Sequence, residues 1–149
     1  MNSEIQQLID RLFEKYPIDF IALATAEIEP RTGLKEIKWE FVSGNQSEQY
    51  KKIRLQIGKG IGGIVWRTGR PYLASGLQAD KAKLMAYPIA RMEKLEVVFA
   101  FPLMSRDRVI SVVLVGNRES REFPPHILEQ IQLEGEALTR MLEGRENGE

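Results

Sequence analysis

The glycine-rich stretch from Gly58 to Pro71 holds the residues whose spacing could most directly do chemistry. Gly58, Gly60 and Gly63 satisfy the spacing G-x-G-x-x-G, which in dinucleotide-binding folds places a pyrophosphate at the start of a long helix. The spacing alone is weak evidence, because short glycine patterns also occur wherever a chain must turn tightly. Its meaning therefore depends on the segments on either side.

Both flanks argue against a nucleotide site. Before the glycines, Ile53, Leu55 and Ile57 alternate with polar residues, which indicates a strand with one wet face and not a buried parallel strand. After them, Gly69 and Pro71 end any helix after about two turns. A P-loop of the type G-x-x-x-x-G-K-[ST] is absent as well.

Most catalytic chemistry is excluded by composition. The chain has no cysteine, so a disulfide, a thiolate metal site, an iron–sulfur cluster and a cysteine nucleophile are all impossible. His126 is the single histidine, and it lies at the expected start of a helix, where we assign it no role. No pair of carboxylates has an evident acid–base function, and we predict that the protein is not an enzyme and holds no metal.

Length and charge point to one ordinary globular domain spanning residues 1–149. Lys plus Arg and Asp plus Glu both number 21, so no basic surplus favours nucleic acid. The longest apolar runs, 97–104 and 109–115, have the length of strands, and the sequence shows neither a signal peptide nor a membrane span. We therefore expect a cytoplasmic protein with no membrane partner.

The hydrophobic pattern predicts an α+β protein that begins and ends in amphipathic helices, at about 3–16 and 124–143. The predicted hairpin has strands at 97–104 and 109–115. Further extended segments are expected at 18–27, 37–42, 50–57 and 72–74, with short helices after the glycines, from about Gly62, and at 80–86. These elements would form a central, mostly antiparallel sheet of five to six strands, flanked by the terminal helices.

Three motifs in succession resemble those of GAF domains, and the match covers almost the whole chain. The motifs are Gly58-x-Gly60-x-x-Gly63-x-Val65-x-x-Thr68-Gly69-x-Pro71, then Phe99-Ala100-Phe101-Pro102-Leu103, then Arg108-Val109-Ile110-x-Val112-x-x-Val115. The resemblance implies a ligand pocket on the sheet face opposite the terminal helices, and a homodimer through those helices. Ser111 departs mildly from the glycine that many members have there.

A closer similarity is to the nitrate-receptor, NreA-type GAF proteins that work beside a sensor histidine kinase. The residues that carry it are Trp39-x-x-Val42-x-Gly44-Asn45, Glu48-x-Tyr50-Lys51-Lys52-Ile53, Gly58 to Gly63, Tyr87-Pro88-Ile89 and Gly116-Asn117-Arg118. The resemblance implies an anion site formed by Trp39, by Gly60, Ile61, Gly62 and Gly63, and by Tyr87, Pro88 and Ile89. Ile61 and Gly62 stand where Leu and Ala are expected, which would enlarge the pocket.

Physical chemistry is compatible with this site. Amides at a helix start lack intrahelical partners and carry the positive end of the helix dipole, so a small monoanion can bind there without an arginine. Nitrate is planar and weakly hydrated, which suits an apolar wall of Trp39 and Ile89, and the Tyr87 hydroxyl could help to close the site.

Simpler explanations stay open for each element. Trp39 can be a plain core aromatic, which is the commoner role of an isolated Trp on a strand. The glycines can be turn formers alone, and Tyr87-Pro88-Ile89 can be a loop whose own side chains fill the pocket. The alternative function keeps the fold: a GAF dimerisation or interaction module whose pocket is empty or binds another small metabolite. The main hypothesis is a cytoplasmic GAF sensor that binds nitrate and modulates a histidine kinase.

Overall fold

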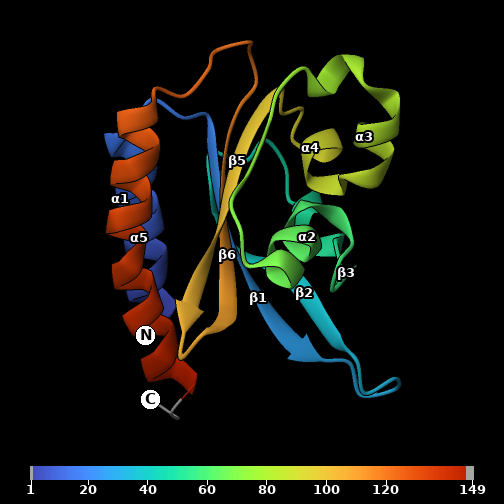
Figure 1. Cartoon of the computed structure of the whole chain (residues 1–149), viewed down its shortest axis with the longest axis vertical. Coiled ribbons are helices and arrows are strands. Elements are labelled where there is room, and N and C mark those ends of the chain that lie inside the picture. Colours follow the sequence, from blue (N-terminus) through green and yellow to red (C-terminus); the bar gives the residue numbers. More distant parts are fainter. Residues whose placement is uncertain (1, 147–149) are drawn as a thin grey trace.

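A computed structural model describes residues 2–146 of the protein. Six strands form one antiparallel sheet with the order β3-β2-β1-β6-β5-β4 (Figure 1). The strands are β1 (Phe20–Ile28), β2 (Lys35–Ser43), β3 (Leu55–Gln56), β4 (Tyr72–Ala74), β5 (Val97–Ser105) and β6 (Arg108–Asn117). The α+β architecture and the antiparallel sheet expected from the sequence are confirmed.

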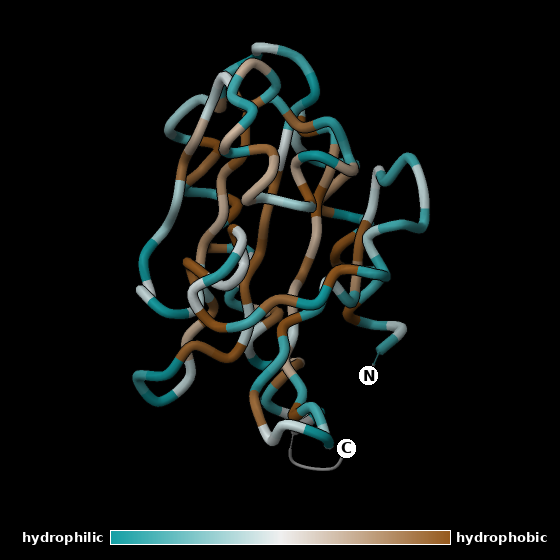
Figure 2. The backbone as a smooth tube through the Cα atoms, turned by 90° about the vertical axis from the view of Figure 1, so that its right-hand side faces the viewer, coloured by the Kyte–Doolittle hydropathy of each residue, from teal (hydrophilic) through white to brown (hydrophobic). Residues whose placement is uncertain are grey.

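The central strands separate two apolar cores. In β1, Phe20, Ala22 and Ala24 belong to one buried cluster, whereas Ile21 and Leu23 belong to the other. Successive side chains of a strand point to opposite faces, so a strand buried on both faces must be apolar at every position. This explains the unbroken apolar runs in β1 and β6. In Figure 2, apolar residues follow the strands and polar residues follow the loops.

Two long helices, α1 (Asn2–Lys15) and α5 (Pro125–Glu146), cover one face of the sheet (Figure 1). Their buried hydrophobic side chains recur at the spacing of one helical face. They are Ile5, Ile9 and Leu12 in α1 and Ile131, Leu138 and Leu142 in α5. The amphipathic terminal helices predicted from the sequence are confirmed. Among the described residues, no helix is long and apolar enough to cross a bilayer.

Short elements cover the other face. They are the 3-10 helices η1 (Gln49–Lys52) and η2 (Leu77–Ala79) and the helices α2 (Gly60–Thr68), α3 (Lys81–Ala86) and α4 (Pro88–Met92). Gly69 ends α2 in the left-handed region with φ of 65° and donates its amide to Val65 O, as its position before Pro71 predicts. This face therefore consists of many chain reversals, each with backbone groups that need partners.

Three local expectations were wrong. The segment 50–57 is extended only at its end, because the amides of Lys51 and Ile53 close 3-10 turns onto Glu48 O and Tyr50 O. Tyr87-Pro88-Ile89 is not a loop, since Pro88 occupies the first turn of α4, where its missing amide is tolerated. The helix after the glycines begins at Gly60 and not near Gly62.

The hairpin of β5 and β6 agrees with its prediction. Arg106 and Asp107 form its two-residue turn, with φ of 52° and 63°. Two successive positive φ values define the turn type that matches the twist of the flanking strands. The short strand predicted at 72–74 is also present.

Candidate functional site

The start of α2 presents backbone amides without partners. Lys59 precedes the helix in an extended conformation, and its side chain does not cap the helix. The amide of Gly63 donates to Lys59 O at 3.0 Å. No acceptor in the described part of the chain takes the amides of Gly60, Ile61 and Gly62. Such amides at the positive end of a nine-residue helix can bind an anion.

The glycines of this helix start have different surroundings. A Cβ on Gly63 would lie 2.4 Å from Gln56 O, and one on Gly60 would lie 2.8 Å from a methyl carbon of Leu55. Both glycines are therefore required for the close turn between β3 and α2. A Cβ on Gly62 would lie 3.3 Å from Cζ2 of Trp39. Of the three, Gly62 is the one that faces the tryptophan.

Trp39 brings a second unpartnered donor to the same place. Its side chain is 2 % exposed, and its indole Nε1–H is buried with no hydrogen-bond partner in the structure. The ring atom that lies against Gly62, Cζ2, is on the side of the indole that carries Nε1. A buried polar group without a partner costs about 1–3 kcal/mol, so such groups commonly mark an absent ligand or water.

Tyr87 and Ile89 reach the same buried cluster from α4. Ile61, Trp39, Tyr87 and Ile89 all belong to the core between the sheet and the short helices. Pro88 is half-buried in the first turn of α4, so its role is to start that helix. The expected residues are thus brought to one region, although Gly60 and Gly63 turn toward β3.

Tyr72 is a member of this region that sequence reasoning missed. Its hydroxyl lies 2.7 Å from the Tyr87 hydroxyl, and the two rings meet edge to face with centroids 5.9 Å apart. Burial, together with the hydrogen bond to Tyr87, raises the pKa of Tyr72 above its ordinary value. Tyr72 therefore stays neutral and fixes the Tyr87 side chain. Its short strand was predicted, but nothing in the sequence indicates this pairing.

Glu93 is a second residue that the sequence did not indicate. It lies in a run of charged residues after α4 and yet is fully buried. Its Oε1 accepts from Arg118 Nη2 at 2.6 Å and from the Gln46 amide at 2.9 Å, whereas its Oε2 has no partner. Arg118 also donates to Asp19 O and Gly44 O. The ion pair fastens the end of α4 to the chain segments flanking β1 and β2.

The region around Trp39 is closely packed, and a shallow pocket reaches it from outside. This pocket of about 260 Å³ lies just before the start of β3, where the edge of β2 has no neighbouring strand. Its lining residues are Lys38, Trp39, Glu40, Tyr50, Lys51 and Arg54. Each of its three cations has a carboxylate within ion-pair distance, and Glu40 lines the pocket as well, so the mouth carries little net charge. Among residues 2–146, no cluster of His, Asp and Glu is arranged to hold a metal ion.

Comparison with solved structures identifies the class of fold. The GAF domain of a two-component sensor histidine kinase from Bacillus halodurans superposes with a TM-score of 0.76, at 14% identity, over 100% of this chain and 98% of that one. At this identity the match concerns the fold alone. The six-stranded sheet, the terminal helices and the short helices on the opposite face are those of a GAF domain.

Two further structures narrow the identification. An NreA protein from Staphylococcus aureus, mutated in its nitrate binding site, is 31% identical over 83% of this chain and 89% of that chain, with a TM-score of 0.76. A hypothetical protein from S. aureus is 32% identical over 81% of this chain and 98% of that one, with a TM-score of 0.74. The chain belongs to the NreA family of GAF proteins. No family model matches the sequence, and no curated protein shows significant sequence similarity.

Proposed function

We propose that the protein is a single-domain, cytoplasmic GAF sensor that binds nitrate and modulates a partner sensor histidine kinase. One observation carries the proposal: the indole of Trp39, whose Nε1–H is buried and unpartnered, packs against Gly62 in the first turn of α2, where the backbone amides are free. Membership of the NreA family supports nitrate as the anion, because the S. aureus relative has a nitrate binding site.

The chemistry of this site suits nitrate better than phosphate or sulfate. Its donors are neutral groups, namely the indole N–H and the amides of Ile61 and Gly62, and its walls are apolar. A strongly hydrated dianion would lose more hydration than these donors return, whereas nitrate has one delocalised charge. Ile89, which is 1% exposed, and Tyr87 would enclose the ligand.

Occupancy would reach the surface through the elements that close the site. Tyr87 directly precedes α4, and Glu93 directly follows it and is held by Arg118. A ligand that binds one arrangement of α4 better than another shifts the population toward that arrangement. The changed position of α4 would alter the surface that the kinase recognises.

Isothermal titration with nitrate, with chloride as the matched anion, tests the proposal. We expect saturable 1:1 binding of nitrate in the micromolar to millimolar range and no comparable heat with chloride. Trp39→Ala should weaken binding more than Trp66→Ala. The proposal fails if nitrate gives no saturable heat, or if chloride binds equally well.

A second candidate function is supported by the outer side of α5. A groove of about 410 Å³ runs between β5 and α5, lined by residues that include Phe101 and Arg140, and Leu133 nearby is 66% exposed. A dimerisation module would use this surface. Light scattering and a thermal-shift panel of metabolites distinguish the nitrate sensor from the dimerisation module. A dimer whose melting temperature does not respond to anions favours the dimerisation module.

We propose no catalytic activity for either function. Cysteine-dependent sulfoxide reduction, which other GAF proteins perform, has no nucleophile in this chain. Turnover of methionine sulfoxide in a reductase assay would contradict the proposal.

A further inference from the structure

The sheet splits between its two central strands. β1 and β6 pair from Phe20 and Gly116 only as far as Ala24 and Val112. Beyond that point β1 remains paired with β2 as far as Ile28, and β6 remains paired with β5 back to Arg108. The two hairpins therefore diverge, as Figure 1 shows at the lower ends of β1 and β6.

The divergence leaves backbone groups of both strands without ladder partners. In an antiparallel sheet, alternate residues of a central strand direct their N–H and C=O groups to each neighbour. Ser111, which is fully buried, closes the top of the split by donating its hydroxyl to Ala24 O at 2.6 Å. Below it, no hydrogen bond among the described residues joins β1 to β6. The split is thus a pair of open strand edges inside a sheet.

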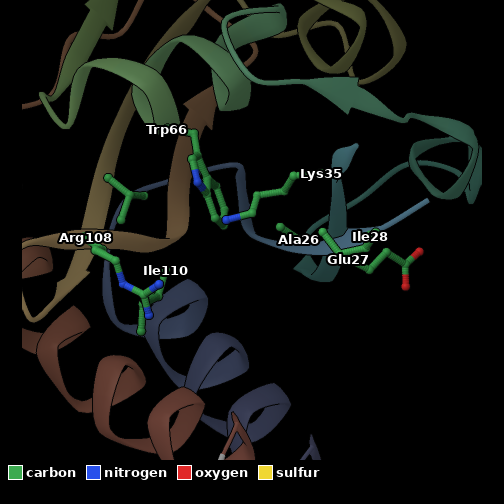
Figure 3. A pocket seen from close by; sticks show the side chains of 8 residues that line it. Ala26, Glu27, Ile28, Lys35, Trp66, Arg108 and Ile110 are labelled. Atoms are coloured by element: carbon green, nitrogen blue, oxygen red, sulfur yellow. The ribbon is translucent and has the colours of Figure 1, made fainter. Parts of the chain in front are cut away.

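A pocket of about 220 Å³ occupies the split (Figure 3). Its lining combines an apolar floor with charged side chains at the mouth. The lining residues are Ala26, Glu27, Ile28, Lys35, Trp66, Arg108, Val109 and Ile110. Trp66 belongs to the core under the short helices, whereas Ile110 belongs to the core under α1 and α5. The pocket therefore lies in the plane of the sheet, where the two cores meet.

The mouth of the pocket carries unneutralised positive charge. The ammonium of Lys35 lies 5.8 Å from the centroid of the Trp66 ring. Within the described chain, neither Lys35 nor Arg108 has a carboxylate within ion-pair distance. The carboxylate of Glu27 is engaged by Lys38 and points away from Arg108 (Figure 3). An occupant with acidic groups would complement this charge.

The shape and lining favour a polypeptide over a small molecule. A volume of about 220 Å³ is below the roughly 300–1,000 Å³ of ordinary small-molecule sites. A row of strand N–H and C=O groups is satisfied in register by another backbone, which is how β-augmentation achieves affinity. Of the two edges, that of β1 is the regular one, because β6 carries a bulge at Ile110 where Leu103 pairs with Ser111 and Met104 with Val109.

We propose that the split is a docking groove in which an extended, acidic segment of a partner protein adds as a strand to β1. Its apolar side chains pack on Ile28 and Trp66, and its carboxylates meet Lys35 and Arg108. Ile28 is 58% exposed at this edge, which leaves apolar surface for the incoming strand. The groove is separate from the anion site at Trp39 and does not depend on it.

The test uses a fluorescein-labelled heptapeptide of alternating Glu and Val, with blocked termini, and fluorescence anisotropy with the full chain. We expect saturable binding that weakens by about tenfold or more in Lys35→Glu/Arg108→Glu, through two lost charge pairs and the added repulsion. Lys81→Glu, a charge reversal at an exposed residue of α3, is the control and should bind as the unmodified protein does. Circular dichroism confirms folding of each variant.

Backbone methylation separates strand addition from simple charge attraction. N-methylation of one alternate set of peptide amides should abolish binding, whereas methylation of the other set should be tolerated, because one edge of the peptide faces β1. No peptide binding, or equal binding of both methylated peptides, overturns the proposal. Full competition by succinate would instead assign a small-carboxylate site, and self-association abolished by the double variant would assign a second copy; either result also overturns it.

Discussion

Trp39 and Glu40 are neighbours in β2, yet their polar atoms have opposite surroundings. Glu40 lies toward α5 and accepts three hydrogen bonds, from Thr25 Oγ1 at 2.6 Å and from the guanidinium of Arg145 at 2.8 and 3.1 Å. Trp39 lies toward the short helices, where its Nε1–H has no acceptor. One strand therefore contributes a satisfied polar group to one face of the sheet and an unsatisfied one to the other.

The two faces of the sheet as a whole also differ in whether their buried polar groups have hydrogen-bond partners. The face under α1 and α5 is closed by two long amphipathic helices whose buried residues are apolar. Within residues 2–146, the buried side-chain atoms without partners are Trp39 Nε1, in the core under the short helices, and Glu93 Oε2, directly after α4. The first face serves stability, and we infer that the second face serves binding, because a ligand can supply what the packing leaves out.

The largest expected effect comes from removing Glu93. Glu93→Ala leaves the Arg118 guanidinium without its buried carboxylate, and breaking such a pair costs about 3–5 kcal/mol of unfolding free energy. Urea denaturation measures the loss. Glu93→Gln keeps an acceptor for Arg118 and the Gln46 amide and should cost less. A loss below about 1 kcal/mol in Glu93→Ala would show that the pair does not anchor α4.

A substitution on the sheet face under α1 and α5 should change the stability of the protein and leave its affinity for nitrate unchanged. Leu138 is fully buried in α5, and Leu138→Ala removes its packing at a cost of about 2–5 kcal/mol. The affinity for nitrate, measured by titration below the unfolding transition, should not change. An altered affinity would mean that the two faces are coupled and that the division of roles is wrong.

A substitution of Trp39 should lower the affinity for nitrate and leave the stability nearly unchanged. Trp39→Phe removes the indole donor and retains most of the aromatic surface, so the affinity for nitrate should fall by about two- to tenfold, the effect of one hydrogen bond. The unfolding free energy should change by less than about 1 kcal/mol, because a buried donor without a partner is removed. Trp66→Phe is the matched control; an equal loss of affinity there would place the site elsewhere.

The smallest expected effect is the pH-dependent contribution of Glu40 to stability, on the sheet face under α1 and α5. Burial alone would raise the pKa of Glu40, but hydrogen bonds from Arg145 and Thr25 outweigh it and lower the pKa below 4.5. Glu40 therefore stabilises the fold above about pH 4.5, and this contribution is lost as the pH falls through the lowered pKa. Glu40→Gln should cost less than about 1 kcal/mol at pH 7 and nothing at the lowest pH. A pH-independent difference in urea titrations would contradict this assignment.

Much of the fold could be predicted from periodicity and turn chemistry. The stripe of Ile5, Ile9 and Leu12 indicates α1, and the turn at Arg106 and Asp107 indicates the hairpin. The wrong predictions concern short elements, because a few residues are too few to show a helical or strand periodicity. Tyr50 begins a 3-10 turn in a segment that alternates like a strand, and α4 spans only Pro88–Met92.

The candidate site was predictable only in part. Trp39, the glycines and Tyr87 were indicated by family motifs, although the structure gives Gly60 and Gly63 a role in the turn. The burial of Glu93 and the pairing of Tyr72 with Tyr87 depend on contacts between distant segments. Neither leaves a local pattern, since a charged residue after a short helix is ordinarily exposed.

The indole N–H signals in a ¹⁵N–¹H NMR spectrum test the central claim most directly. The chain has two tryptophans, so two indole signals are expected, and Trp39→Phe assigns them. On addition of nitrate, the Trp39 signal should move and saturate with the binding curve, while the Trp66 signal stays in place and chloride has no effect. A Trp39 signal that does not respond while nitrate binds would contradict the account, as would a response confined to Trp66.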